Sequence, residues 1–212
     1  MLQRSVPMYQ ECQDLAVHWC TKYAKPFTSV YDLGCSTGKF LFKLAEKLEQ
    51  PKNIELIGLD NSSAMLEKAE ETFKNSPLPC SMIKTDLNKK LSIENASVVV
   101  MNYTLQFVEQ DNRSTLLKSI YDGLVSDGSL ILIEKVKSEI SDLNQSFIEF
   151  HHHFKEENGY SKLEVSQKRE ALENVLIPWT VEQNRELIRS AGFSTVDLFF
   201  KWNNFAGFIA LK

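Results

Sequence analysis

The fold is decided by the stretch Val30-Tyr31-Asp32-Leu33-Gly34-Cys35-Ser36-Thr37-Gly38. Residues 30–33 are apolar enough for a buried strand, and Gly34 and Gly38 allow a sharp turn with close approach of the backbone. Residues 39–50 then repeat apolar side chains at helical spacing. The stretch therefore predicts a strand, a glycine turn and a helix, in that order.

An acidic residue, Asp60, follows Gly38 by 22 residues and ends a second apolar run. In a strand, turn and helix unit, the backbone N–H groups at the start of the helix face the ligand. An acid at the end of the next strand can then accept hydrogen bonds from ribose hydroxyls. The sequence thus predicts a nucleoside site.

The spacing of the turn limits which nucleoside it can hold. A dinucleotide site needs G-x-G-x-x-G, whereas this turn reads Gly34-x-x-x-Gly38 with Ser36 at the middle position of an acid-x-G-x-G-x-G pattern. A P-loop needs four residues between its glycines and Ser or Thr after the lysine, whereas here three intervene and Phe40 follows Lys39. S-adenosylmethionine, whose amino-acid tail carries a carboxylate and an ammonium in place of phosphates, is the remaining common ligand. A tight turn in an unrelated α/β protein is the alternative.

The composition favours one domain that acts on a small molecule. A chain of 212 residues with 43% hydrophobic and 25% charged residues can bury one substantial core, so we expect residues 1–212 to form a single S-adenosylmethionine-binding domain with an insertion. The net charge is −4, and no cluster of Lys and Arg suited to a nucleic-acid backbone is apparent. We therefore expect no direct contact with nucleic acid.

Neither a metal nor a membrane is expected from the cysteines and the apolar runs. The four cysteines form no C-x-x-C pair and fit no zinc spacing, which is typical of reduced thiols in the cytoplasm. No run reaches 18 apolar residues, and no signal-like segment is seen at the start of the chain. The run His151-His152-His153 does not change this expectation, because consecutive side chains on a helix point about 100° apart.

Helices and strands alternate as far as residue 134. The predicted strands after the first cover residues 54–60, 80–84, 96–102 and 129–134. The predicted helices carry apolar stripes made of Cys12, Leu15, Ala16, Trp19 and Tyr23, of Met65, Leu66, Ala69 and Phe73, and of Leu116, Leu117, Ile120 and Leu124. Ser62 is expected to cap the helix that carries Met65. The alternation predicts an α/β fold with a mostly parallel sheet and helices on both faces.

Four positions suited to ligand contact fall at the carboxyl ends of the predicted strands. They are Gly34, Asp60, Asp86 and Asn102. Ligands of such sheets bind outside the carboxyl ends of the strands, so we expect these residues to share one site.

The second half of the chain departs from simple alternation. Residues 138–176 resemble two long polar helices around Asn158-Gly159-Tyr160, and we expect this insertion to cover the ligand edge. Thr180-x-x-Gln183 is a capping box that opens another helix. Residues 194–201 and 205–211 then predict a closing antiparallel hairpin, which brings the sheet to seven strands.

Several segments resemble the carboxy-S-adenosylmethionine synthase family nearly from end to end. They are Arg4-Ser5-Val6-Pro7-x-Tyr9, Tyr31-Asp32-Leu33-Gly34-Cys35-Ser36-x-Gly38, Asp60-Asn61-Ser62, Asn102-x-Thr104-Leu105-Gln106-Phe107, Asn158-Gly159-Tyr160-Ser161 and Ser166-Gln167-Lys168-Arg169. The first and last of these distinguish the synthase from other proteins with the class I methyltransferase (Rossmann-like) fold, which the resemblance also implies. Met8 stands where the family pattern has glycine, and His153 stands where it has aspartate.

The resemblance implies a carboxylation of S-adenosylmethionine, which is a substrate here, and no requirement for a metal. Prephenate would supply the carboxyl group and leave as phenylpyruvate and water, and a partner enzyme would use the product to modify wobble uridine in tRNA. The chemistry is plausible because a sulfonium acidifies its methyl group, and holding carbon dioxide beside the resulting carbanion is a proximity effect. A homodimer in the cytoplasm is implied as well.

The resemblance also implies roles for ten residues. Nine would contact S-adenosylmethionine, namely Tyr9, Gly34, Cys35, Ser36, Asp60, Asn61, Asp86, Leu87 and Asn102. Arg169 would reach in from the neighbouring subunit, bind the ligand and hold the new carboxylate, since a guanidinium matches a carboxylate in a bidentate manner.

Simpler structural roles exist for several of these residues. Tyr9 could pack on the first helix, Asp86 could cap a helix, Asn102 could satisfy a strand end and Arg169 could lie on a charged helix face. Two other functions stay open on the residues alone, a small-molecule S-adenosylmethionine-dependent methyltransferase and a non-catalytic subunit that binds S-adenosylmethionine.

Overall fold

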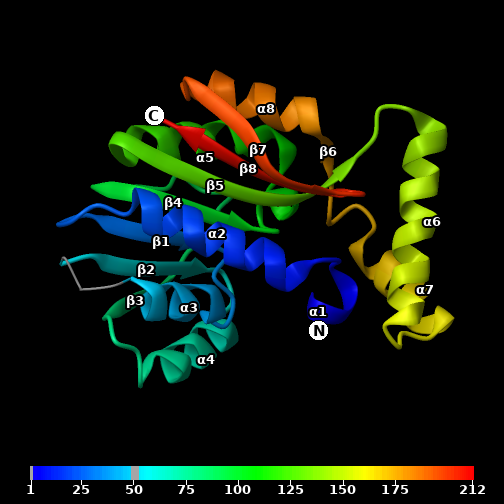
Figure 1. Ribbon diagram of the computed structural model, residues 1–212, viewed down its shortest axis with the longest axis horizontal. Coiled ribbons are helices and arrows are strands. Elements are labelled where there is room, and N and C mark those ends of the chain that lie inside the picture. The colour runs from blue at the N-terminus through cyan, green and yellow to red at the C-terminus, as the bar shows by residue number, and fades with distance from the viewer. Residues whose placement is uncertain (1, 49–52) are drawn as a thin grey trace.

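A central twisted sheet organises the computed structural model, which describes residues 2–48 and 53–212 (Figure 1). Its main path has the order β3-β2-β1-β4-β5-β8-β7. The parallel strands are β1 (Ser29–Leu33), β2 (Glu55–Asp60), β3 (Cys80–Lys84), β4 (Ala96–Asn102) and β5 (Leu124–Lys137). The antiparallel strands are β7 (Thr195–Trp202) and β8 (Phe205–Leu211), and the two-residue β6 (Trp179–Thr180) pairs with the end of β5. This is the class I methyltransferase fold, with the mostly parallel sheet and final hairpin that the sequence predicts.

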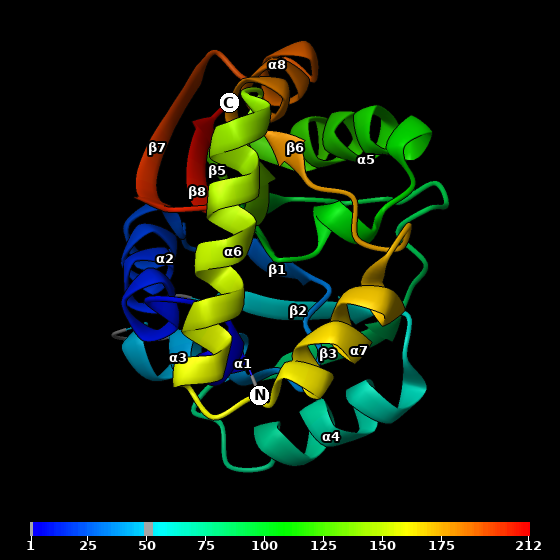
Figure 2. The same ribbon diagram turned by 90° about the vertical axis from the view of Figure 1, so that its right-hand side faces the viewer.

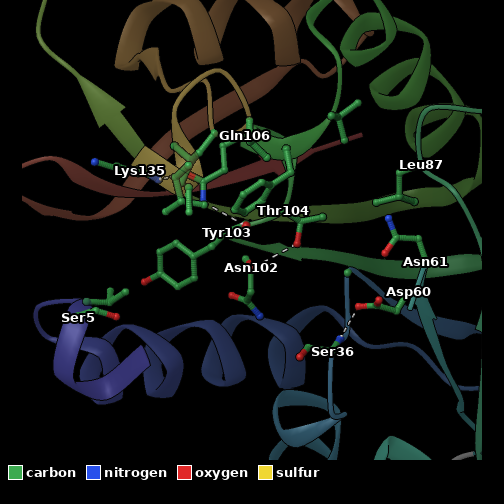
Figure 3. A pocket seen from close by; sticks show the side chains of 18 of the residues that line it. Ser5, Ser36, Asp60, Asn61, Leu87, Asn102, Tyr103, Thr104, Gln106 and Lys135 are labelled. Carbon is green, nitrogen blue, oxygen red and sulfur yellow. Dashed lines mark hydrogen bonds between the residues drawn. The ribbon is translucent and has the colours of Figure 1, made fainter. Parts of the chain in front are cut away.

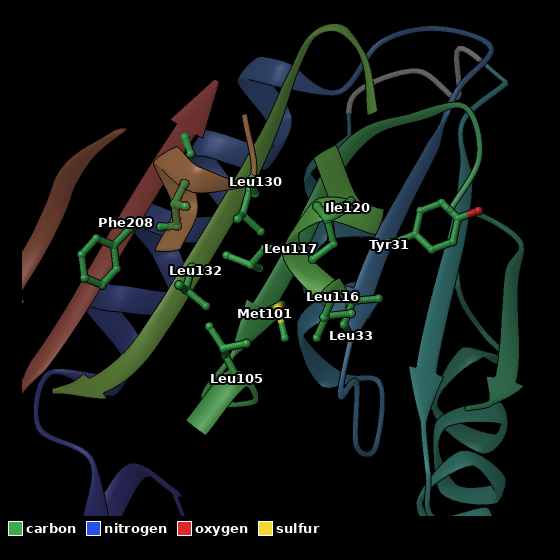
Figure 4. Close-up of a cluster of buried hydrophobic side chains, with 14 of the residues drawn as sticks. Tyr31, Leu33, Met101, Leu105, Leu116, Leu117, Ile120, Leu130, Leu132 and Phe208 are labelled. Atoms are coloured by element: carbon green, nitrogen blue, oxygen red, sulfur yellow. The ribbon is translucent and has the colours of Figure 1, made fainter. Parts of the chain in front are cut away.

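Helices cover both faces of the sheet because its strands alternate apolar side chains between them. Along β4, Val98 and Val100 face the layer of α2 (Tyr9–Tyr23), α3 (Lys39–Lys47) and α4 (Ser63–Phe73). Val99 and Met101 face α5 (Gln110–Gly123) and α8 (Val181–Ser190). Figure 4 shows the second of these cores, in which Leu33, Met101 and Leu132 from three neighbouring strands meet Leu117 and Ile120 of α5.

Two further helices stand at the carboxyl edge of the parallel strands, where the insertion is expected. They are α6 (Ser141–Glu157) and α7 (Lys162–Leu172), and both views place them beside that edge (Figure 2). The short helix α1 (Leu2–Ser5) contacts α6, and Nε of Arg4 donates to the carbonyl of Asn158 at 2.8 Å. The N-terminal segment therefore fastens the turn between α6 and α7. No helix in residues 2–48 or 53–212 has the length and apolarity to span a membrane.

Most predicted elements are confirmed, with corrections of physical interest. The Thr180 capping box forms as expected, since Oγ1 of Thr180 accepts from the amide of Gln183 and the side chain of Gln183 accepts in return. Ser62 stands at the N-cap of α4, but its hydroxyl makes no capping bond. The predicted position of the cap is confirmed, but the side-chain bond is not formed, and the backbone amide of Ser62 donates to Asp60 at 2.9 Å.

Two apolar residues were assigned wrongly by periodicity alone. Leu15 belongs by spacing to the stripe of α2, but it is exposed, and the buried face of that helix includes Val17 and Cys20 instead. Leu124 begins β5 instead of ending α5, and β5 continues beyond the predicted residue 134 to Lys137. The helix predicted over residues 39–50 ends at Lys47, and its predicted last two residues lie outside the described part of the chain.

Candidate functional site

The turn between β1 and α3 needs glycine for two physical reasons. Gly34 and Gly38 have φ angles of 81° and 71°, in the left-handed region that residues with a Cβ disfavour. A Cβ on Gly34 would also collide with the side chain of Thr104, which follows β4. Glycine at this position therefore makes room for the side chain of Thr104, which packs directly against the turn.

Ser36 and Asp60 fix the top of this turn. Ser36 is also left-handed, with φ 50°, although it carries a side chain where the acid-x-G-x-G-x-G pattern has glycine. Its amide donates to Oδ2 of Asp60 at 2.9 Å, and the amide of Ser62 donates to Oδ1 at the same distance. The carboxylate at the end of β2 thus links the turn after β1 to the turn after β2.

A cavity of about 840 Å³ opens at this edge of the sheet (Figure 3). Its volume is near the upper end of the range of about 300–1,000 Å³ for small-molecule sites. Seven of the residues predicted from the sequence line it, namely Gly34, Ser36, Asp60, Asn61, Asp86, Leu87 and Asn102. The structure therefore brings together the strand ends that the sequence singled out.

Three of the predicted residues are not among those that line this cavity. Cys35 is buried, and its amide is already bound to the carbonyl of Leu59 at 2.9 Å. Tyr9 lies one layer behind the cavity and stacks on Tyr103, with 6.4 Å between the ring centroids. Arg169 is exposed on α7.

Two polar groups near the middle of the cavity are buried without a hydrogen-bond partner in the described part of the chain. They are Nδ2 of Asn102 and the hydroxyl of Tyr103. Oδ1 of Asn102 accepts from Gln13 at 3.4 Å, which orients the amide. Burial raises the pKa of Tyr103, so its hydroxyl stays protonated. The Tyr103 hydroxyl lies close to the thiol of the buried Cys12, so Nδ2 of Asn102 is the group that can donate to a ligand in the cavity.

The loop that carries these groups is held by Glu134, which the sequence analysis missed. The buried carboxylate accepts from the amides of Thr104 at 3.0 Å, Leu105 at 2.8 Å and Gln106 at 3.1 Å. Burial raises the pKa of Glu134 to about 8, against the effect of these three bonds. The signal was present in the sequence, because an acid inside a run as apolar as β5 needs buried partners.

The wall opposite Asp60 is basic, and this was also missed. Lys135 comes from the end of β5, Lys155 from α6 and Lys168 from α7, and all three line the cavity. In Figure 3, Lys135 lies on the opposite side of the view from Asp60 and Asn61. Lys135 lies near the end of a strand, so the reasoning that predicted Asp60 could also have predicted Lys135. No sequence pattern links Lys135 to Lys155 and Lys168.

His151 joins this wall to the N-terminal segment. Its Nε2 donates to the carbonyl of Ser5 at 2.8 Å, and burial lowers its pKa to about 3, so the ring is neutral. His152 is half-buried, whereas His153 is exposed and pairs with Glu157 at 3.2 Å. The three imidazoles therefore lie in three different environments, as the helical spacing requires.

Comparison with known proteins identifies the family. The family model described as a methyltransferase domain matches residues 30–128. Carboxy-S-adenosyl-L-methionine synthase from Methylococcus capsulatus is 46% identical over 100% of this chain and 88% of that protein. The protein of the same name from Nautilia profundicola is 41% identical over 100% of this chain and 89% of its own length.

Solved structures share the fold at low identity. A SAM-dependent methyltransferase from Methanosarcina mazei has a TM-score of 0.62 at 19% identity and covers 90% of this chain and 95% of its own. Human N-acetylserotonin methyltransferase, solved with SAM, has a TM-score of 0.64 at 16% identity over 99% of this chain and 53% of its own. The fold follows from these likenesses and the family from the sequence matches, so this chain belongs to the carboxy-S-adenosyl-L-methionine synthase family of transferases.

Proposed function

We propose that this protein converts S-adenosylmethionine and prephenate to carboxy-S-adenosylmethionine and phenylpyruvate. The observation that carries the proposal is 46% identity over the whole chain to a carboxy-S-adenosyl-L-methionine synthase. The cavity supports it, because a nucleoside-type end and a basic end face each other within one volume of about 840 Å³. If S-adenosylmethionine were the only ligand, no anionic group would pair with the lysines at the basic end of the cavity.

The residues at the nucleoside end fit S-adenosylmethionine. Asp60 is placed for the ribose hydroxyls, and Leu87 gives an apolar surface for adenine next to Asp86 and Asn61. Gly34 and Ser36 line the cavity on the side where the amino-acid tail would lie. The unpartnered amide nitrogen of Asn102 can donate to the tail carboxylate. In this proposal Tyr9 acts through Tyr103, and Cys35 contributes to the turn through its backbone.

The reaction balances without an external oxidant or a metal. Aromatisation of the prephenate ring breaks two bonds, one that releases carbon dioxide and one that releases hydroxide. The sulfonium methyl loses a proton to the hydroxide, giving water, and its carbon forms the new bond to carbon dioxide. The protein has to hold both substrates together and exclude water, which is the proximity effect expected of a closed cavity.

The proposal includes a homodimer in which Arg169 of one subunit completes the site of the other. Arg169 is exposed and does not line the cavity of its own chain. Large apolar side chains are exposed on the same insertion, namely Ile140, Leu143, Phe150, Leu163, Leu172 and Val175. Leu172 and Val175 also line the cavity, and the other four are apolar side chains that a second subunit could cover. A guanidinium brought in across that interface would pair with the new carboxylate.

The proposed product passes to a second enzyme that modifies wobble uridine in tRNA in the cytoplasm. This protein would then meet only small molecules itself. Its net charge of −4 agrees with a role in which only the second enzyme contacts tRNA, because a tRNA-binding surface is usually rich in Lys and Arg.

One incubation tests the proposal. The purified protein is mixed with S-adenosylmethionine and prephenate, and the sulfonium product is weighed by mass spectrometry. We expect the product to gain one carboxyl group, and we expect phenylpyruvate to form in equal amount. S-adenosylhomocysteine as the product would identify a methyltransferase, and unchanged S-adenosylmethionine would identify a non-catalytic binding subunit.

A further inference from the structure

Three lysines from three separate elements meet at one wall of the cavity. Lys135 comes from β5, Lys155 from α6 and Lys168 from α7. Each is half-buried, although lysine normally keeps its ammonium group in water. The fold therefore gathers three positive charges at a place where packing alone does not require them.

These charges are not neutralised by the protein. Among residues 2–48 and 53–212, no carboxylate oxygen lies within 4.0 Å of the ammonium nitrogen of Lys135, Lys155 or Lys168. The ammonium of Lys168 donates to the hydroxyl of Tyr160 at 2.7 Å, which positions it but leaves its charge. Burial, then Lys135 and Lys168, lower the pKa of Lys155 to about 8. The positive charges of Lys135 and Lys168 thus destabilise the charged form of Lys155.

The acidic groups of the cavity have other partners. Asp60 is bound by the amides of Ser36 and Ser62 on the far side, and Asp86 accepts from the amide of Asn88 at 3.0 Å. Glu134 precedes Lys135 in the sequence, but its carboxylate is turned into the core and held by three amides of the loop after β4. The cavity is therefore divided into an end that accepts hydrogen bonds from hydroxyls and an end that attracts anions.

We propose that Lys135, Lys155 and Lys168 form the subsite that binds the two carboxylates of the second substrate, prephenate. This inference rests on the proposed function and names the residues that select its second substrate. A dicarboxylate can neutralise two of the three ammonium charges at this wall, whereas a monocarboxylate neutralises one. Because the cavity is continuous, the dicarboxylate lies next to the sulfonium end of the first ligand.

The wall is positioned by the N-terminal segment. Lys155 lies one helical turn after His151, whose neutral ring donates to the carbonyl of Ser5. Arg4 binds the turn between α6 and α7, and its guanidinium lies 4.8 Å from the ring centroid of Tyr160, the partner of Lys168. Residues 4 and 5 therefore set the distance between the two helices that supply Lys155 and Lys168.

The test measures binding without turnover. The protein is saturated with S-adenosylhomocysteine, which has no methyl group to carboxylate, and prephenate is titrated by calorimetry. In Lys155→Met and Lys135→Met we expect prephenate affinity to fall roughly 10- to 100-fold, as for the loss of a hydrogen bond to a charged group. Affinity for S-adenosylhomocysteine should stay within about twofold, because the two ends share no partner. Lys155→Arg should restore most of the prephenate affinity.

Matched controls come from the same elements. Lys137→Met on β5 and Lys162→Met on α7 remove exposed lysines that do not line the cavity, and both should bind prephenate like the parent protein. The melting temperature of Lys155→Met should be equal or higher, since the substitution relieves repulsion, which separates loss of binding from unfolding. Phenylpyruvate, a monocarboxylate, should bind more weakly than prephenate and lose less affinity in the variants.

The outcomes distinguish this inference from the proposed function. If the parent protein binds prephenate through these lysines but yields no carboxylated product, the subsite stands and the reaction is wrong. If the product forms while Lys135→Met and Lys155→Met bind prephenate like the parent protein, the subsite is wrong and the reaction stands. Failure of the parent protein to bind prephenate at all would also overturn the subsite.

Discussion

Asp60 is the single residue on which the nucleoside end most depends. Its oxygens hold the amides of Ser36 and Ser62, each at 2.9 Å, and each oxygen keeps a lone pair for a ribose hydroxyl. In Asp60→Ala the affinity for S-adenosylmethionine should fall roughly 10- to 100-fold by calorimetry. Asp60→Asn, which keeps one acceptor oxygen, should be intermediate. Binding by Asp60→Ala as tight as that of the parent protein would contradict the role of this carboxylate.

Met8 carries a local strain that a single substitution can relieve. It precedes α2 with φ 50° and ψ 34°, a left-handed conformation that costs a residue with a side chain roughly 1–2 kcal/mol. The family pattern has glycine here, and the backbone angles explain why. Met8→Gly should therefore raise the free energy of unfolding by about 1 kcal/mol in a denaturant titration, after the entropic cost of glycine. A clear loss of stability would show that packing of the methionine outweighs the strain.

The site could be predicted residue by residue only where a local pattern marked it. Asp60 and Asn102 end strands that are visible in the sequence, and Asp86 follows the end of β3 by two residues, so the strand-end argument predicts all three at one edge. Lys155 and Lys168 lie on polar helices among other charged residues, where no spacing sets them apart. They become part of a site only through the packing of the insertion against the sheet.

At the scale of the elements, apolar runs predicted the buried strands better than periodicity predicted the helix faces. The strand β4 was predicted with its observed bounds, because a fully buried strand is a continuous apolar run. In α2 the spacing predicts that Leu15 is in the core, but Leu15 is exposed and Val17 and Cys20 are buried, because the spacing of apolar residues does not fix which face of a helix meets the sheet. The hydrogen bonds of Glu134 join β5 to the loop after β4, so neither segment predicts them from its own sequence pattern.

The raised pKa of Glu134, which holds the loop after β4 against β5, predicts that the free energy of unfolding depends on pH. Burial raises its pKa to about 8 from 4.5, so the folded protein binds an extra proton between these values. This contribution to stability is present at low pH and is lost as the pH rises through about 8. The free energy of unfolding should therefore fall from about pH 5 to about pH 9, and it should fall less in Glu134→Gln.

Asp32 adds a second pH dependence, which the comparison of the two proteins cancels. Its pKa is also raised by burial, to about 7, so it adds a slope of the same sign in both proteins. The difference between the parent protein and Glu134→Gln then reports Glu134 alone. Identical pH profiles for the two proteins would mean that the carboxylate is ionised in the folded state throughout this range.

At the scale of the whole molecule, the proposed exchange of Arg169 between subunits predicts complementation. Arg169→Ala should abolish the carboxylated product while S-adenosylmethionine affinity stays within about tenfold, because the guanidinium pairs with the new carboxylate. Asp60→Ala should be inactive at low S-adenosylmethionine. When the two variants are mixed and allowed to exchange subunits, the intact Asp60 of one chain can meet the intact Arg169 of the other.

Activity that returns on mixing would support the shared site. Arg169→Ala mixed with itself, and Asp60→Ala mixed with itself, are the controls and should stay inactive at the same concentration. If the hybrid is shown to form and remains inactive, Arg169 does not act across the interface. If Arg169→Ala alone retains full turnover, the arginine has no part in the reaction.

The most direct measurement of the central claim follows the carboxyl carbon itself. Prephenate labelled with carbon-13 in its ring carboxylate is incubated with the protein and S-adenosylmethionine, and the sulfonium product is examined by mass spectrometry and NMR. We predict that the label is found in a new carboxylate bonded to the former methyl carbon, with unlabelled phenylpyruvate as the second product. S-adenosylhomocysteine, or a sulfonium product without the label, would contradict the proposal that this cavity captures the carboxyl group of prephenate.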